Sequence, residues 1–169
     1  MNTTPAQENL LPSARFLAGL AAILFIPIVV CFFLPEVPAW ADYPGIIFHL
    51  AIFGLVSRLP APEWGRAAGY GWLVVDTTVG VMTMHGIGEE IFAPIRFGGH
   101  IFAGIWIVSA SVGGSRLLQI LGVISGLYLG GFTFVSTFLP MQALAPASIL
   151  VTVWLIIIAF YDGNGRKEA

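Results

Sequence analysis

Long runs of apolar residues, separated by short polar segments, constrain this chain more than any other feature of its sequence. A helix needs roughly 20 apolar residues to cross the hydrocarbon core of a bilayer. Segments of about this length follow one another along the chain, at residues 16–34, 44–59, 67–84, 94–112, 116–139 and 143–161. Their polarity does not alternate as it would in barrel strands, so each segment is predicted to form a transmembrane helix.

The composition agrees with a membrane protein. Hydrophobic residues make up 57% of the 169 residues and charged residues only 9%, whereas soluble domains average about 25% charged residues. We expect an all-α bundle of six transmembrane helices over residues 15–162, with polar tails at 1–14 and 163–169. The chain has one cysteine, Cys31, so no intrachain disulfide can form.

The basic residues predict the orientation of this bundle. In a six-helix arrangement all but one of them fall on the same side of the membrane: Arg15, Arg58, Arg66, Arg116, Arg166 and Lys167. Arg96 alone falls on the other side. By the positive-inside rule both termini are cytoplasmic, which is typical of a multi-pass protein of the cell (inner) membrane. Trp40 and Tyr43 are then expected at the outer interface and Trp64 at the inner one.

Asp76 is the most unusual residue of the apolar segments. It lies in the middle of segment 67–84 and is followed by Thr77. A carboxylate at the centre of a bilayer costs roughly 3 kcal/mol on insertion scales, and such groups often mark ion or substrate pathways. Asp76 and Thr77 are therefore candidate ligand- or proton-binding residues. The alternative is a structural aspartate that is protonated or hydrogen-bonded to a neighbouring helix.

All three histidines are expected in the outer half of the membrane or at its outer face. His49 lies about one turn into the second segment from its outer end, and His100 lies about two turns into the fourth. We group both with Asp76 as candidate contacts to a ligand or proton. The segment from His85 to Gly99 is expected to form an outer loop. From it we predict an outer gate of four residues: His85, Glu89, Glu90 and Arg96.

Imidazoles and carboxylates together suit three kinds of chemistry. They bind divalent metals, they relay protons near neutral pH, and two histidines can ligate a haem. No His-Glu-x-x-His or other diagnostic spacing is present in the chain, so no metal site is predicted and the cofactor stays unknown. Glu89 and Glu90 also have a structural interpretation, as negative charges near the start of the fourth helix that pair with Arg96.

Three glycines at four-residue spacing mark the fifth segment. Gly122, Gly126 and Gly130 form a small-xxx-small pattern, which lets two helix backbones approach closely. The partner is either another helix of the same chain or a second copy, and a six-helix bundle favours the internal partner.

The sequence favours a transport-related function. No nucleotide-binding or hydrolase motif is present, which disfavours an enzyme, and no basic patch indicates nucleic-acid binding. We expect a small solute or cation to bind in an outward-opening polar cavity around Asp76. Two alternatives stay open: a metal- or haem-dependent enzyme or redox subunit, and an accessory subunit of a membrane complex. The expected partners are the lipid bilayer, such a ligand, and a second copy or a larger membrane complex.

Overall fold

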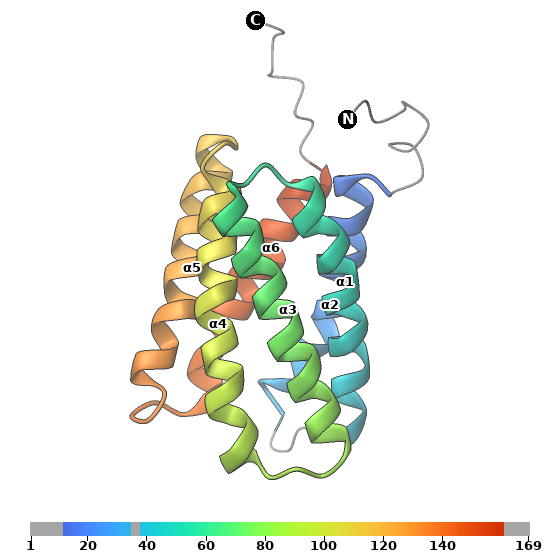
Figure 1. The fold of residues 1–169 in the computed structure, drawn as a ribbon, viewed down its shortest axis with the longest axis vertical. Coiled ribbons are helices and arrows are strands. Elements are labelled where there is room, and N and C mark those ends of the chain that lie inside the picture. The colour runs from blue at the N-terminus through green and yellow to red at the C-terminus, as the bar shows by residue number, and fades with distance from the viewer. Residues whose placement is uncertain (1–11, 35–37, 161–169) are drawn as a thin grey trace, which may run out of the picture.

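The computed structural model describes residues 12–34 and 38–160, and in these residues the chain is entirely helical, with no strand. Two short 3-10 helices accompany six α-helices (Figure 1). In chain order the elements are α1 (Ala14–Cys31), η2 (Ala39–Ala41), α2 (Asp42–Arg58), α3 (Glu63–Met84), α4 (Glu89–Ser111), α5 (Arg116–Val135), η3 (Met141–Leu144) and α6 (Ala145–Phe160). The predicted tails lie almost wholly outside the described residues.

The six α-helices form a closed bundle in which successive helices run in opposite directions (Figure 1). Each helix packs against its neighbours in the sequence, and α6 also packs against α1. The short connections explain this arrangement, because two helices joined by a short loop usually pack antiparallel. The beginning of α1 and the end of α6 therefore lie at the same end of the bundle.

Four helices of the described chain are long and apolar enough to cross a membrane. They are α1, α4, α5 and the segment Met141–Phe160, which joins η3 to α6. These four indicate a membrane protein, but six such helices were predicted. The two others differ for separate reasons. α2 has only 17 residues. α3 is long enough with 22 residues, but its glycines, threonines and Asp76 make it less apolar than the other helices.

Most of the described arginines gather at one end of the bundle. Arg15 and Arg116 lie at or next to the first residues of α1 and α5. Arg58 is the last residue of α2, and Arg66 lies in the first turn of α3. The alternating helix directions bring all four to the same end (Figure 1), which we call the arginine end. Arg166 and Lys167, which were predicted on this side too, lie outside the described residues.

Aromatic side chains mark both ends of the bundle. Trp64 is exposed beside the arginine end, and Trp40 and Tyr43 are exposed at the opposite end. Tryptophan and tyrosine are enriched at membrane–water interfaces, so their positions fit the predicted belts.

The loop between α3 and α4 is shorter than predicted. The segment 85–99 was expected to be irregular, but α4 already begins at Glu89, so only His85 to Gly88 connect the helices. The turn depends on Gly86, whose φ of 75° is easily reached only by glycine. Glu89 and Glu90 thereby occupy the first turn of α4, where a negative charge is favourable.

Indole rings and glycines fill the centre of the bundle. Trp106 lies between Trp72 and Trp154, with ring centroids 5.8 Å and 5.6 Å away. The indole of Trp154 donates to the hydroxyl of Ser111 at 2.9 Å. Gly126 of α5 packs directly on Gly104 of α4, where a methyl group at 126 would lie 2.6 Å from the Gly104 carbonyl oxygen. The glycine face of α5 is thus turned towards α4 within the same chain.

A candidate proton or cation site among helices α2, α3 and α4

Asp76 lies near the middle of α3 with its carboxyl group inside the bundle. The side chain is only 8% exposed. One helical turn earlier on the same helix, Trp72 donates its indole N–H to Asp76 Oδ2 at 2.5 Å. The two residues are four apart and so share a helix face. α3 itself therefore supplies the first hydrogen bond to the buried carboxyl.

His49 of α2 supplies the second contact to the same oxygen. Its Nε2 atom lies 3.3 Å from Asp76 Oδ2, and its side chain is 13% exposed. The other ring nitrogen, Nδ1, lies 2.7 Å from the carbonyl oxygen of Gly45, one turn earlier on α2. The ring also packs edge-on against Phe48 and Trp72. Both ring nitrogens are thereby engaged, and the ring orientation is fixed.

The second carboxyl oxygen of Asp76 faces α4. A methyl group at Gly99 would lie 3.0 Å from Asp76 Oδ1, so only glycine lets α4 come this close. The next residue, His100, is 7% exposed and interacts electrostatically with Asp76 and with His49. Asp76 Oδ1 and His100 Nδ1 are both buried without a hydrogen-bond partner. The helices α2, α3 and α4 thus bring three titratable groups together in the core.

A charge pair lies between this site and the end of the bundle opposite the arginine end. Arg96, one turn before His100 on α4, has an Nη2 atom 3.8 Å from Oδ1 of Asp42, the first residue of α2. The guanidinium also lies over the ring of Phe92, 5.3 Å from its centroid. Asp42 precedes the predicted apolar segment of α2; its partial burial raises the pKa of this carboxyl, and Arg96 opposes the rise.

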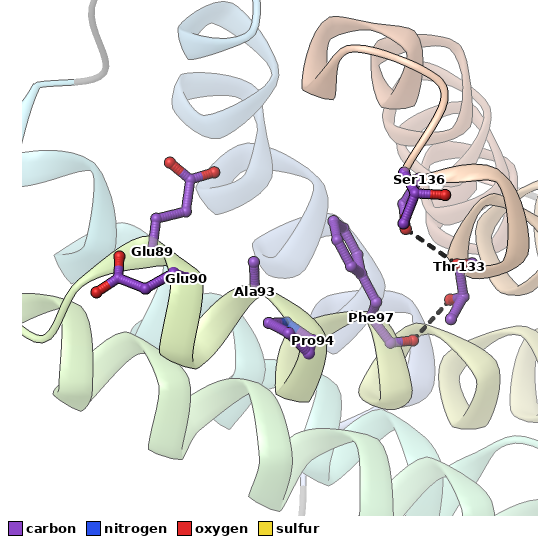
Figure 2. Close-up of a pocket in the computed structure, with 8 residues that line it drawn as sticks. Glu89, Glu90, Ala93, Pro94, Phe97, Thr133 and Ser136 are labelled. Carbon is purple, nitrogen blue, oxygen red and sulfur yellow. Dashed lines mark hydrogen bonds between the residues drawn. The ribbon is translucent and has the colours of Figure 1, made fainter.

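The four predicted gate residues do not form one cluster. His85 follows the last residue of α3 and is exposed, and Arg96 pairs with Asp42. Glu89 and Glu90 instead line an open groove of about 600 Å³ between α4 and α5, together with Ala93, Pro94, Phe97, Thr133, Ser136 and Thr137. Figure 2 shows the two glutamates at one end of this groove and Ser136 and Thr133 at the other.

This groove is not the expected cavity around Asp76. None of Asp76, Thr77, His49 and His100 lines it. Thr133 of α5 donates its hydroxyl to the Phe97 carbonyl oxygen at 2.7 Å (Figure 2). This hydrogen bond joins the two helices at the groove, which both residues line. The groove with Glu89 and Glu90 is therefore separate from the residues predicted around Asp76.

The described histidines and carboxylates can also be compared with the needs of a metal site. Within residues 12–34 and 38–160, no group of three or more histidine, cysteine, aspartate and glutamate side chains is placed to hold a metal ion. His49 would have to give up Asp76 or Gly45 to ligate a metal or haem, because each of its ring nitrogens already has a partner.

Sequence reasoning missed two residues of the site. Trp72 lies four positions before Asp76, and this spacing could have revealed it as a neighbour on the same face of the helix. Asp42 lies outside the apolar segments, and no local spacing relates it to Arg96, because the two residues come from different helices. Only the folded bundle, in which both helices pack on α3, shows that the two side chains meet.

Gly99 offers a direct test of the close contact between α3 and α4. A methyl group there would lie 2.9 Å from Val75 Cγ1 as well as against Asp76, whereas one at Gly98 would meet nothing within 4 Å. We expect Gly99→Ala to lower the free energy of unfolding by about 1–3 kcal/mol through overpacking. Gly98→Ala should be neutral or slightly stabilising, since alanine favours helix. Denaturant unfolding in detergent micelles measures both; equal effects of the two variants would contradict the contact.

Comparison with known proteins adds no relative to this geometry: no family model, no curated protein and no solved structure matches the chain.

Proposed function

We propose that all six α-helices cross the cell membrane, with both termini in the cytoplasm. The surfaces of α2 and α3 support this proposal even though neither helix is long and apolar enough by itself. Their exposed residues include Ile47, Leu50 and Phe53 on α2 and Val74 and Val81 on α3. Their polar residues Asp76 and His49 face inwards instead. An apolar exterior around a polar interior is the arrangement that a lipid environment favours.

The positive-inside rule then places the arginine end in the cytoplasm. The opposite end, with Arg96 and Asp42, faces outwards. The titratable groups therefore extend from the outer end to the middle of the membrane, in the order Asp42 and Arg96, His100, and then Asp76 with His49.

We propose that the protein binds a small cation at Asp76, taken up from the outer side, as part of a transport process. The observation that carries this function is the pairing of Asp76 with His49 inside an otherwise apolar bundle. Isolated charges are expensive at this depth, and those that persist mark ion or proton pathways. In this function Asp76 supplies the negative charge that attracts the cation. His49, which contacts the same carboxyl group, senses whether a cation is bound there.

The remaining polar residues have separate roles in this proposal. His100 is the next titratable group towards the outside, and the Asp42–Arg96 pair closes the outer end above it. Glu89 and Glu90 raise the local concentration of cations near the outer surface, since like charges focus the field of a protein. Thr77 follows Asp76 and adds a hydroxyl at the same depth.

Cation flux into reconstituted vesicles tests this function. The full-length protein would be placed in liposomes, and the entry of H⁺, Na⁺, K⁺ and methylammonium would be followed with dyes and tracers. We expect Asp76→Asn to reduce the flux of the transported ion at least tenfold, because the amide keeps the shape but removes the charge. Glu63→Gln, which neutralises an exposed carboxylate in the first turn of α3, is the matched control. Equal flux through wild type and Asp76→Asn would rule out this function.

The two other functions have weaker support. An accessory subunit was expected to use the glycine face of α5, but that face packs on α4. A metal- or haem-dependent subunit was expected to use His49, whose two nitrogens already contact Gly45 and Asp76.

A further inference from the structure

We propose that His49 and Asp76 together bind one proton, shared between His49 Nε2 and Asp76 Oδ2, so that the small cation of this site is H⁺. This inference rests on the proposed function and names its ligand. It starts from the two contacts of the His49 ring, which lie on opposite sides of it.

The first contact fixes the position of one hydrogen atom. A backbone carbonyl oxygen can only accept a hydrogen bond. Since Nδ1 of His49 lies 2.7 Å from the carbonyl oxygen of Gly45, Nδ1 must carry a hydrogen. In a neutral imidazole only one ring nitrogen is protonated, so Nε2 of a neutral His49 presents a lone pair to Asp76.

The second contact then requires a further proton. An ionised carboxylate is also only an acceptor. Neutral His49 and ionised Asp76 would therefore set two lone pairs against each other at 3.3 Å and leave a negative charge in the core. One added proton removes both problems. It resides either on Nε2, as an imidazolium that donates to the carboxylate, or on Oδ2, as a carboxylic acid that donates to the imidazole.

The surroundings accommodate both positions of the proton. Trp72 donates to Oδ2, and this hydrogen bond is compatible with a carboxylate and with a carboxylic acid, because each keeps a lone pair on that oxygen. The occupied pair carries no net charge in either form. This neutrality suits its burial, since an isolated charge in the interior is costly.

The groups that face the pair come from α2, α3 and α4. α4 contributes His100, which interacts electrostatically with Asp76 and His49, and Arg96, which acts on His100. α2 contributes Asp42 opposite Arg96, and α3 contributes Trp72. Two atoms between α3 and α4, Asp76 Oδ1 and His100 Nδ1, are buried without a hydrogen-bond partner. His100 can therefore accept a proton that arrives from the outer end before it reaches the pair.

Loss of the shared proton would change the structure as well as the charge. The two acceptors would repel each other, and α2 and α3 would separate at this depth or the carboxyl would turn towards α4. Proton release is therefore coupled to the packing of α2 against α3.

Nitrogen-15 NMR of the full-length protein in micelles tests the proposal directly. Histidine ring nitrogens report whether each carries a hydrogen, and the signals of His49 are assigned by their loss in His49→Gln. We expect Nδ1 of His49 to stay protonated throughout, and Nε2 to be either protonated or hydrogen-bonded to a protonated carboxyl. Infrared spectra should show a carboxylic acid band only in the second case. A bare Nδ1, or a neutral His49 beside an ionised Asp76, would overturn the proposal.

Tryptophan fluorescence provides a second measurement that needs no transport assay. Because the Trp72 indole is bonded to Asp76, loss of the shared proton on raising the pH should change its emission. We expect this fluorescence step to fall at least fivefold in Asp76→Asn and in Trp72→Phe. It should persist in Trp64→Phe, which removes an exposed indole from the same helix. A step of equal size in Asp76→Asn would contradict the proposal.

The two proposals can fail separately. If cation flux depends on Asp76 but His49 and Asp76 share no proton, the function stands and H⁺ is the wrong ligand. If the shared proton is present but flux is the same in Asp76→Asn, the proton site stands and the transport function is wrong.

Discussion

Replacing Gly126 with leucine is expected to lower the free energy of unfolding of the bundle by about 3 kcal/mol. A methyl group at this position would already lie 2.6 Å from the Gly104 carbonyl oxygen and 2.7 Å from Val108 Cγ2. The carbonyl oxygen belongs to the backbone of α4 and cannot turn aside as a side chain could. α4 and α5 would have to move apart along their contact, and the hydrogen bond from Thr133 to Phe97 would weaken with them.

The matched control for this substitution is Gly131→Leu on the same helix. Gly131 is exposed, and a methyl group there would meet nothing within 4 Å. We therefore expect Gly131→Leu to change the free energy of unfolding little, or to raise it through better helix propensity. Equilibrium unfolding in detergent, followed by circular dichroism, compares the two. If both variants unfold alike, the glycine face of α5 does not pack on α4 in the way described.

Removing His49 is expected to have the second large effect. His49→Leu leaves the buried Asp76 carboxyl with Trp72 as its remaining donor, and breaking a buried pair in this way typically costs about 3–5 kcal/mol. We expect the free energy of unfolding to fall by about 3 kcal/mol, the lower value of this range, because the carboxyl group that has lost its partner can take up a proton. Adding Asp76→Leu should recover part of the loss, because a buried pair that is replaced entirely by apolar residues is often tolerated.

A double-mutant cycle separates this pairing from simple packing. The free energies of unfolding of wild type, His49→Leu, Asp76→Leu and the double variant would be measured at one pH. We expect a coupling energy of about 2 kcal/mol, in the range found for residues in direct contact. Additive effects of the two substitutions would show that His49 and Asp76 do not interact in the folded protein.

Much of the fold could be predicted from the sequence because helix formation in an apolar setting is a local matter. A run of about 20 apolar residues must satisfy its backbone polar groups internally, and only helices and closed barrels do so. The helical segments and their alternating directions followed from this rule. The predicted boundaries were wrong at two ends. α4 begins five residues before the predicted segment and α5 ends four residues before its predicted end, because glycine, proline and glutamate near helix ends are compatible with either state.

The candidate site was predictable in part. The sequence predicted His49 and His100 in the outer halves of their segments and Asp76 in the middle of its own. It therefore indicated that the three could line one cavity, but not that His49 would contact Asp76 directly. The segment 85–99 was misjudged, since its glycines suggested a loop although Glu89 and Glu90 begin a helix. No spacing along the chain indicated that Glu89 and Glu90 would lie along α5 while Arg96 would face α2.

By itself the sequence determined that this chain is an all-helical membrane protein with a carboxyl group in its apolar interior, because both properties depend on the chemistry of short segments. The tertiary structure decided which atoms meet that carboxyl. His49 Nε2 and Trp72 Nε1 contact Asp76 Oδ2, while Gly99 lets α4 approach Oδ1. These contacts depend on how three helices rotate about their axes, and that rotation is set by the packing of the whole bundle, with Gly104 against Gly126 and three indoles at its centre.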